Sequence, residues 1–123
     1  MTIIADFVAA LSAYSNVRAY RFDSHQTDEI CIIPGGGTVA CVSHATGAGT
    51  SDIAMPNVQI QVRDPDLQTA ETRALAIKDL LHRGTVSNCL SVFWDGRQPD
   101  YWTDDNDLHI FAIEFNVIRN PGL

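Results

Sequence analysis

Residues 58–63 read Val-Gln-Ile-Gln-Val-Arg and are followed directly by Asp64 and Pro65. The strict alternation places the three aliphatic side chains on one side of an extended chain and the polar ones on the other, which predicts a half-buried β-strand. We expect Asp64 to cap a helix that has proline at its first position, where the missing N–H costs nothing. A strand that leads at once into a helix is therefore the central unit of the expected fold.

The helix expected after this strand spans residues 65–83. Its apolar side chains recur at intervals of three and four, which predicts one buried stripe made of Leu67, Ala70, Ala74, Ile77 and Leu81, widened by Leu80. Gly84 stands where a left-handed residue commonly ends a helix. A helix of this length, about 28 Å at 1.5 Å per residue, can cross a whole sheet.

The start of the chain predicts a second amphipathic helix. Apolar residues at spacings of three and four place it over residues 3–14, with Thr2 as its N-cap. The polar segment that follows is expected to be a connection, with a short strand around residues 18–22.

Two short strands are expected at residues 30–33 and 39–42, because both runs are apolar and β-branched residues are frequent in them. Pro34-Gly35-Gly36-Gly37 lies between the runs and predicts a turn. Residues 44–57 contain many small and polar residues, which predicts a long flexible loop.

The carboxyl-terminal part predicts strands at residues 89–94, 100–103 and 109–119, with an acidic turn at residues 104–107. Together with the earlier elements, these strands predict an α+β fold. We expect a single domain over residues 1–123: a mixed, mostly antiparallel sheet of four to six strands with two helices packed on one face.

Composition limits the classes of partner. The chain has 123 residues, 8 Lys and Arg against 15 Asp and Glu, and a formal net charge of −7. A grip on nucleic-acid phosphates or on an anionic membrane needs clustered cations, which are absent from the sequence. No apolar run approaches the roughly 20 residues that span a bilayer, and the first residues do not resemble a signal peptide. We therefore expect a protein that is cytosolic when it is made.

Three motifs resemble ligand sites but lack residues that such sites require. The glycine run at residues 34–37 has neither the lysine nor the following helix of a phosphate-binding loop. Cys41 and His44 form one loose C-x-x-H pair, whereas a structural zinc site normally has two pairs. Residues 104–107 lack the alternating ligands and final glutamate of a calcium loop. We expect no metal and no cofactor.

The cysteines leave one catalytic alternative open. Cys31, Cys41 and Cys89 are odd in number and lack metal-type spacing, so we interpret them as buried free thiols. Cys89 would form a nucleophilic pair with His82 or His109 if folding brought them together. A structural cysteine is the commoner case, and no G-x-S-x-G motif is present.

Residues 56–63 with the following Asp64 and the helix at residues 70–81 resemble the core of the tail terminator (tail-completion, minor capsid) proteins of long-tailed bacteriophages. The final run at residues 111–119, Phe-Ala-Ile-Glu-Phe-Asn-Val-Ile-Arg, resembles the last strand of that family and also follows an acidic turn. The resemblance covers residues 56–119 and, more loosely, the earlier elements.

The resemblance implies a structural virion protein with no enzymatic activity. It would form a hexameric ring that caps the tail tube, ends polymerisation of the major tail tube protein and joins the head–tail connector protein. DNA would pass through the lumen without specific binding, and an acidic ring suits that passage. No membrane partner is implied. The protein would be assembled in the host cytoplasm and lie at the head-proximal end of the virion tail. The alternatives are a head–tail connector component and, from a different class, a cytosolic ligand-binding or Cys/His hydrolase domain.

A ring of this kind closes through head-to-tail contacts, in which sheet edges can pair between subunits. We expect Arg63 to form an intersubunit ion pair, with Asp64 or Asp66 as its local alternative, and Arg63→Glu to block assembly while leaving the fold intact. Trp94, Tyr101 and Trp102 are interpreted as interface, core or ligand-stacking residues. The loop at residues 44–57 is expected to order against the tube or a neighbour. The interface candidates are Arg63, Asp64, Gly47, Gly49, Thr50, Asp52, Trp94 and Trp102.

Overall fold

The computed structural model describes residues 3–22, 27–41 and 52–119. The elements follow the order α1 (Ile3–Ala10), β1 (Val17–Ala19), β2 (Glu29–Cys41), β3 (Asp52–Asp64), α2 (Leu67–Leu81), β4 (Ser91–Trp94), β5 (Asp100–Thr103) and β6 (His109–Ile118).

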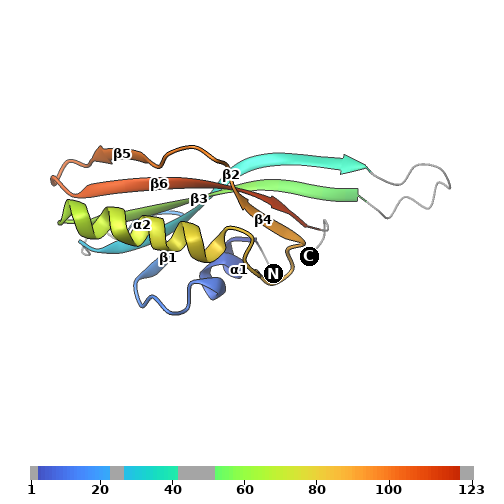
Figure 1. The fold of residues 1–123 in the computed structure, drawn as a ribbon, viewed down its shortest axis with the longest axis horizontal. Helices are drawn as coiled ribbons and strands as arrows, with labels where there is room; N and C mark the ends of the chain where they lie inside the picture. Colours follow the sequence, from blue (N-terminus) through green and yellow to red (C-terminus); the bar gives the residue numbers. More distant parts are fainter. Residues whose placement is uncertain (1–2, 23–26, 42–51, 120–123) are drawn as a thin grey trace.

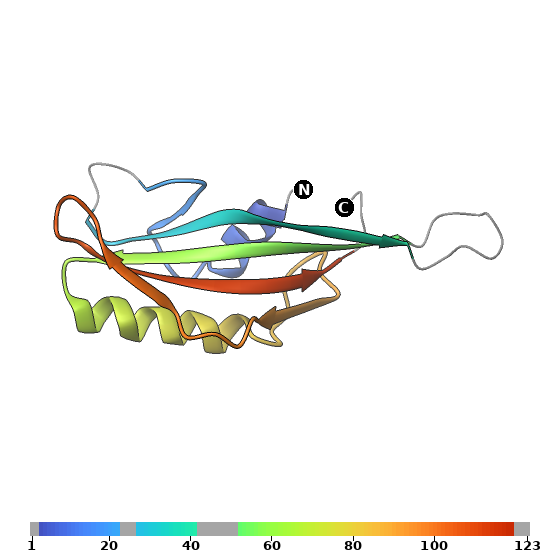
Figure 2. The ribbon, with the colours of Figure 1, turned by 90° about the horizontal axis from the view of Figure 1, so that it is seen from above.

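One sheet of six strands carries both helices on the same face (Figure 1). The strand order is β1-β2-β3-β6-β4, and β5 also pairs with β6. β1 runs parallel to β2, whereas the other pairs are antiparallel. β4 and β5 lie one after the other along the same edge of β6, seen from above in Figure 2. The expected α+β class, with a mixed and mostly antiparallel sheet, is confirmed.

The alternation in β3 defines the core. Val58, Ile60 and Val62 are fully buried on the helix side. β6 adds a matching row on the same side, in which Phe111, Ile113, Phe115 and Val117 belong to the same apolar cluster as the helices. The strand expected at residues 58–63 is therefore present, and it is longer than expected at its amino-terminal end.

α1 is shorter than expected, because residues 11–13 form a turn. Ile4, Phe7 and Leu11 pack into the core as their spacing predicts. The expected cap, Thr2, lies outside the described residues. Asp6 is buried in α1 and forms an ion pair with Arg119, with Asp6 Oδ2 lying 3.3 Å from Arg119 Nη1. This pair joins the first helix to the end of the last strand.

The turn expected at residues 34–37 is wrong. β2 runs without interruption through these residues and absorbs one extra residue as a β-bulge between Pro34 and Gly36. Pro34 pairs with Val58. Ile30 and Ile32 direct their backbone groups away from β3, towards the β1 segment. By this alternation the Pro34 nitrogen also faces away from β3, so its missing N–H costs no hydrogen bond to that strand. A Cβ on Gly35 would lie 3.2 Å from Asn57. Gly35 therefore permits a close strand pairing.

The loop expected at residues 44–57 is wrong for its second part. Residues 52–57 belong to β3 and pair with β2 in the register from Gly36↔Asn57 to Cys41↔Asp52. Residues 44–51 lie outside the described residues. β6 accompanies β3 only as far as Asn57. We call the two-stranded segment beyond this point, residues 37–41 and 52–56, the arm; it extends past the rest of the sheet in Figures 1 and 2.

The connection from β3 to α2 differs from the expectation by two residues. Asp64 is the last residue of β3, and Asp66 is the N-cap, accepting a hydrogen bond from Thr69 N–H at 2.9 Å. Asp64 instead accepts the Asp66 N–H at 2.8 Å. The aspartate before the proline therefore shapes the turn, and the aspartate after it caps the helix.

α2 buries a narrower stripe than expected. Ala70, Ala74, Ile77 and Leu81 face the core, whereas Leu67 and Leu80 are 46% and 51% exposed. At about 100° per residue, Leu80 lies roughly 90° around the helix from the centre of the stripe. The expected left-handed Gly84 is also wrong, because Arg83 has the positive φ of 59°. A Cβ on Gly84 would lie 2.5 Å from the Leu80 carbonyl oxygen, so glycine serves close packing there.

Candidate functional site

Arg63 lies at the end of β3 on the sheet face opposite the helices and is 8% exposed. Its Nη1 lies 3.4 Å from Asp104 Oδ2, and its Nη2 lies 3.8 Å from Glu29 Oε1. The guanidinium also stacks on Phe22, with its central carbon 4.3 Å from the ring centroid. Partners within the chain therefore surround Arg63 on several sides.

Glu29 extends this cluster to a second arginine. It is the residue directly opposite Arg63 on β2, an arrangement that favours opposite charges. The side chain is buried, and a buried carboxylate needs paired charge or hydrogen bonds. Arg18 Nε lies 3.7 Å from Glu29 Oε2 and is half exposed. We call Arg18, Glu29, Arg63 and Asp104 the Arg63 cluster; it joins three strands to the turn before β6.

The acidic run at residues 104–107 forms the expected turn. Asp104 Oδ1 accepts the N–H groups of Asn106 and Leu108 at 2.9 and 3.0 Å, and Asp107 takes a positive φ of 60°. The other oxygen of Asp104 faces Arg63. Sequence reasoning identified the turn but not its link to the Arg63 cluster, because the two segments are distant in the chain.

Asp64 has a different partner from Arg63. Its Oδ2 lies 3.4 Å from Arg73 Nη1 on α2, and the side chain of Asp64 is mostly buried. The local alternative of an Arg63 pair with Asp64 or Asp66 does not match these contacts: Asp64 pairs with Arg73, and Asp66 caps α2. The intersubunit role of Arg63 stays a prediction.

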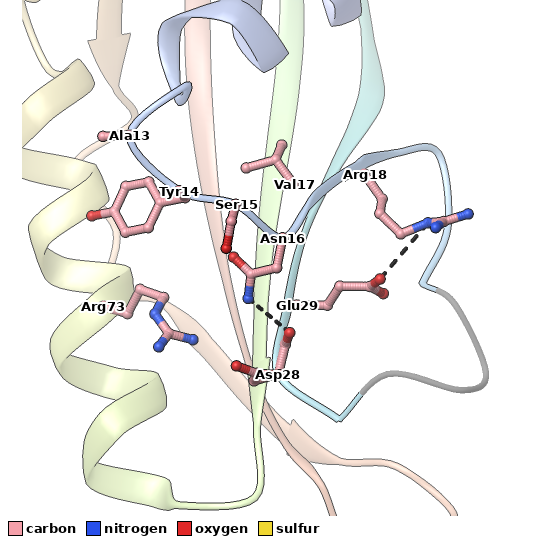
Figure 3. Close-up of a pocket in the computed structure, with 9 residues that line it drawn as sticks. All are labelled: Ala13, Tyr14, Ser15, Asn16, Val17, Arg18, Asp28, Glu29 and Arg73. Carbon is pink, nitrogen blue, oxygen red and sulfur yellow. Dashed lines mark hydrogen bonds and ion pairs between the residues drawn. The ribbon is translucent and has the colours of Figure 1, made fainter.

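A polar cavity of about 500 Å³ lies between α2 and the segment that follows α1 (Figure 3). Arg73 reaches toward it from α2, and Asn16 Nδ2 donates to the Asp28 carbonyl at 2.7 Å on the opposite wall. The lining residues are Ala13, Tyr14, Ser15, Asn16, Val17, Arg18, Asp28, Glu29 and Arg73. They include an arginine pair and carboxylates but neither histidine nor cysteine. A second depression of about 420 Å³ shares Tyr14 and Arg73 with it.

Sequence reasoning missed this cavity. The sequence predicted a helix up to residue 14 and a polar connection after it, with a short strand around residues 18–22. The wall of the cavity forms because β1 pairs in parallel with β2 and carries its preceding segment beside α2. Parallel pairing of a three-residue strand leaves no distinctive pattern in the sequence.

The three neighbouring aromatics separate in the structure. Trp94 pairs with Phe115 near one end of β6, whereas Trp102 pairs with Ile110 five residues away, about 17 Å along the strand. Trp94 is half buried, and its Nε1 donates to the Arg97 carbonyl at 2.9 Å. Trp102 is 39% exposed on the β5 edge. A joint ligand-stacking surface is therefore not formed, and Trp102 remains accessible as an interface candidate.

Lys78 and His82 surround Trp94 from the last turn of α2. Lys78 Nζ lies 4.6 Å from the ring centroid, and the His82 ring meets the indole edge to face. His82 Nδ1 accepts the Trp94 backbone N–H at 3.0 Å. The indole thus packs the end of α2 against β4, which favours the core interpretation for this residue.

The structure does not bring Cys89 and His109 together, and Nδ1 of His82, the other histidine considered, accepts the Trp94 backbone N–H. His109 begins β6 opposite Asp64, whereas Cys89 lies beyond the other end of that strand, where the next residue, Leu90, donates to the Ile118 carbonyl. His109 bonds Tyr101 at 2.6 Å through Nδ1. Burial raises the pKa of the Cys89 thiol. A thiol with a raised pKa is a poor nucleophile.

The other two cysteines both lie in β2. Cys31 is fully buried, and burial, reinforced by the Glu29 carboxylate, raises the pKa of its thiol to about 11. Cys41 pairs with Asp52 at the end of the arm. Of the four loop candidates, Gly47, Gly49 and Thr50 lie outside the described residues, and Asp52 is the first residue of β3.

The part of the chain that the structure describes has neither a metal-type cluster nor a membrane-spanning helix. In that part, no group of three or more His, Cys, Asp or Glu side chains has the arrangement of a metal site. Of the two helices described, neither has the length and apolar character needed to cross a membrane.

Comparison with known proteins gives a likeness in structure and none in sequence. No protein-family model and no curated protein matches the chain. A solved structure described as "Virion of native gene transfer agent (GTA) particle" contains a chain with a similar fold, at a TM-score of 0.61 and 16% sequence identity. The likeness covers 92% of this chain and 83% of that chain. It therefore extends over almost the whole fold.

Proposed function

We propose that this chain is a structural protein of a phage-like virion and, within it, the tail terminator. The observation that carries the proposal is the fold shared with a chain of a gene transfer agent virion over 92% of the length. The strand at residues 56–63, the helix after it and the last strand support the same assignment through their resemblance to tail terminators. Neither argument depends on the other, because one uses backbone geometry and the other uses residues.

In this role the protein forms a hexameric ring at the head-proximal end of the tail. One side of the ring ends the growth of the tail tube, and the other side meets the head–tail connector. The net charge of −7 suits a ring through which DNA passes without being held. The protein acts through contacts between its surface and neighbouring proteins, and we propose no catalytic group, metal or cofactor.

The open sheet face supports an assembly role. Opposite the helices, Gln61 Nε2 donates to Gln59 Oε1 at 2.7 Å, and Gln59 Nε2 donates to Glu114 Oε1 at 2.9 Å. These side chains satisfy one another in a polar row along the sheet. Because their polar groups are already bonded to one another, the row suits contact with a protein surface or a lumen better than binding of a small ligand.

The interface candidates take more specific places in this proposal. Trp102 lies on the exposed β5 edge, and Asp52 is the first residue of β3, at the end of the arm; both are proposed as direct contacts. Gly47, Gly49 and Thr50 lie between the arm strands in sequence and are proposed to meet the tube or a neighbour. Arg63, Asp64 and Trp94 have partners within the chain, so we propose that they position interface elements.

Deletion of the gene in a particle-producing strain tests the proposal. Loss of a terminator should give tails of uncontrolled length that are not joined to heads, and wild-type protein supplied in trans should restore both properties. Electron microscopy of purified particles measures tail length and head attachment. Unjoined tails of normal length would instead assign the connector role. Particles with normal tails and heads would refute a virion role.

A further inference from the structure

The arm has a strand edge that the neighbouring strands β1 and β6 do not cover. β1 accompanies β2 only at residues 30–32, and β6 leaves β3 at Asn57. Among the residues that the structure describes, no third strand lies beside residues 37–41 or 52–56. The arm is five residue pairs long, about 17 Å at 3.4 Å per residue. A two-stranded ribbon alone is marginally stable in water, so a partner is expected.

The register shows which backbone groups point outward. Asp95 N–H donates to the Glu114 carbonyl, so even-numbered residues of β6 direct their backbone groups to β4 and odd-numbered ones to β3. The backbone groups of even-numbered residues of β3 therefore point away from β2. In the arm these residues pair with Gly37, Val39 and Cys41, whose N–H and C=O groups therefore point away from β3, toward the open edge of β2.

Proline explains why the pairing of β3 with β6 ends at Asn57. By the same alternation, Pro56 directs its backbone nitrogen to the β6 side and has no hydrogen to donate. The β3 edge of the arm is thus weakened at its base. The β2 edge has no proline beyond Pro34 and is the better template for an added strand.

The opposite side of the sheet has one blocked edge and one open edge. On β4, the two residues that follow α2 occupy the outward backbone groups. Arg83 N–H donates to the Val92 carbonyl at 2.8 Å, and Nδ1 of the His82 ring accepts the Trp94 N–H. Such covering prevents edge-to-edge pairing. On β5, the alternation directs the backbone groups of Tyr101 and Thr103 outward.

We infer that the β2 edge of the arm adds to the β5 edge of a second copy of this chain. The two edges lie on opposite sides of one sheet, so each copy can pair with one neighbour through the arm and with another through β5. A contact between two different patches of the same chain propagates in one direction and closes into a ring when the rotation fits. The inference rests on the proposed ring and names the elements that close it.

Proline substitutions at outward positions test the pairing without breaking the sheet itself. Val39→Pro and Thr103→Pro each remove an N–H that points away from the chain's own ladder, whereas Val39→Ala and Thr103→Ala keep it. Sedimentation velocity over a wide concentration range measures self-association. Each proline variant should weaken association about tenfold or more, because a backbone bond is lost and the ring blocks the incoming strand. The alanine variants should assemble as the wild type does.

Each result has a separate meaning. Proline variants that assemble as well as the wild type would overturn the arm contact while leaving the ring in place. A wild-type protein that stays monomeric at every concentration would also overturn it, although the gene deletion would still decide the terminator role. Circular dichroism and the melting temperature verify folding, and agreement between the two independent proline sites excludes a local folding defect.

Discussion

Replacement of Arg63 by methionine should cost about 3 kcal/mol of folding stability. The change keeps a long side chain but removes the guanidinium beside Glu29, which is 1% exposed. Removal of one partner from a buried ion pair typically costs about 3–5 kcal/mol, because the other charge stays buried. We take the lower end, since Arg18 still lies 3.7 Å from Glu29. With a urea slope of about 2 kcal/mol per M, the midpoint should fall by about 1.5 M.

The matched control is Arg97→Met. Arg97 also pairs with an aspartate, and its 2.9 Å contact with Asp95 is shorter than either contact of Arg63, but its side chain is 73% exposed. An exposed pair contributes little, so this variant should stay within about 0.5 kcal/mol of the wild type. Equal losses in the two variants would refute the reasoning from burial. Adding Glu29→Gln to Arg63→Met should recover about 1–3 kcal/mol of folding stability, because it removes the buried negative charge of Glu29.

The same cluster changes the meaning of Arg63→Glu. That variant places a third carboxylate beside Glu29 and Asp104, so we predict a larger loss of stability than for Arg63→Met. This prediction differs from the expectation based on the sequence, in which Arg63→Glu leaves the fold intact. Loss of rings in that variant reports on folding as well as on contact.

Gly84→Ala should destabilise the fold by about 1–3 kcal/mol in thermal unfolding, because its Cβ would lie 2.5 Å from the Leu80 carbonyl oxygen; an unchanged melting temperature would contradict this. Asp66→Ala should lower the melting temperature through loss of the α2 cap. Hydrogen bonds from Thr69 lower the pKa of Asp66, so this difference should be full at neutral pH and vanish as the pH falls through that lowered value. Cys31, with its pKa raised to about 11, should resist iodoacetamide at neutral pH until urea unfolds the protein, as read by mass spectrometry.

Local periodicity was sufficient for the types of most elements. The alternation at residues 58–63 placed the right side chains in the core, and the three- and four-residue spacing of α2 identified four of its buried residues. Both patterns report on a single element against one apolar face, which the sequence carries directly. Their limits appear at Leu67 and Leu80, because burial depends on which part of the helix lies over the sheet.

Glycine and proline misled at residues 34–37, where a strand continues. These residues favour turns in isolation, but pairing with β3 over the whole of β2 outweighs that preference. The same pairing converts residues 52–57 from an expected loop into the first part of β3, and residues 52–56 form one strand of the arm. Whether such a segment forms a strand or a turn is decided by its partner strand, here β3 for residues 34–37 and β2 for residues 52–57. The local sequence pattern of a segment does not show its partner.

The sequence by itself determined the central strand–helix unit, the acidic turn before β6, the α+β class and the acidic charge. Only the tertiary structure decided that Arg63 is enclosed by Glu29 and Asp104, that Cys89 and His109 lie toward opposite ends of β6, and that the arm presents a free edge. The physical reason is the same in each case. Propensity and periodicity act between near neighbours, whereas charge pairing, strand register and edge exposure depend on residues that the chain brings together from far apart.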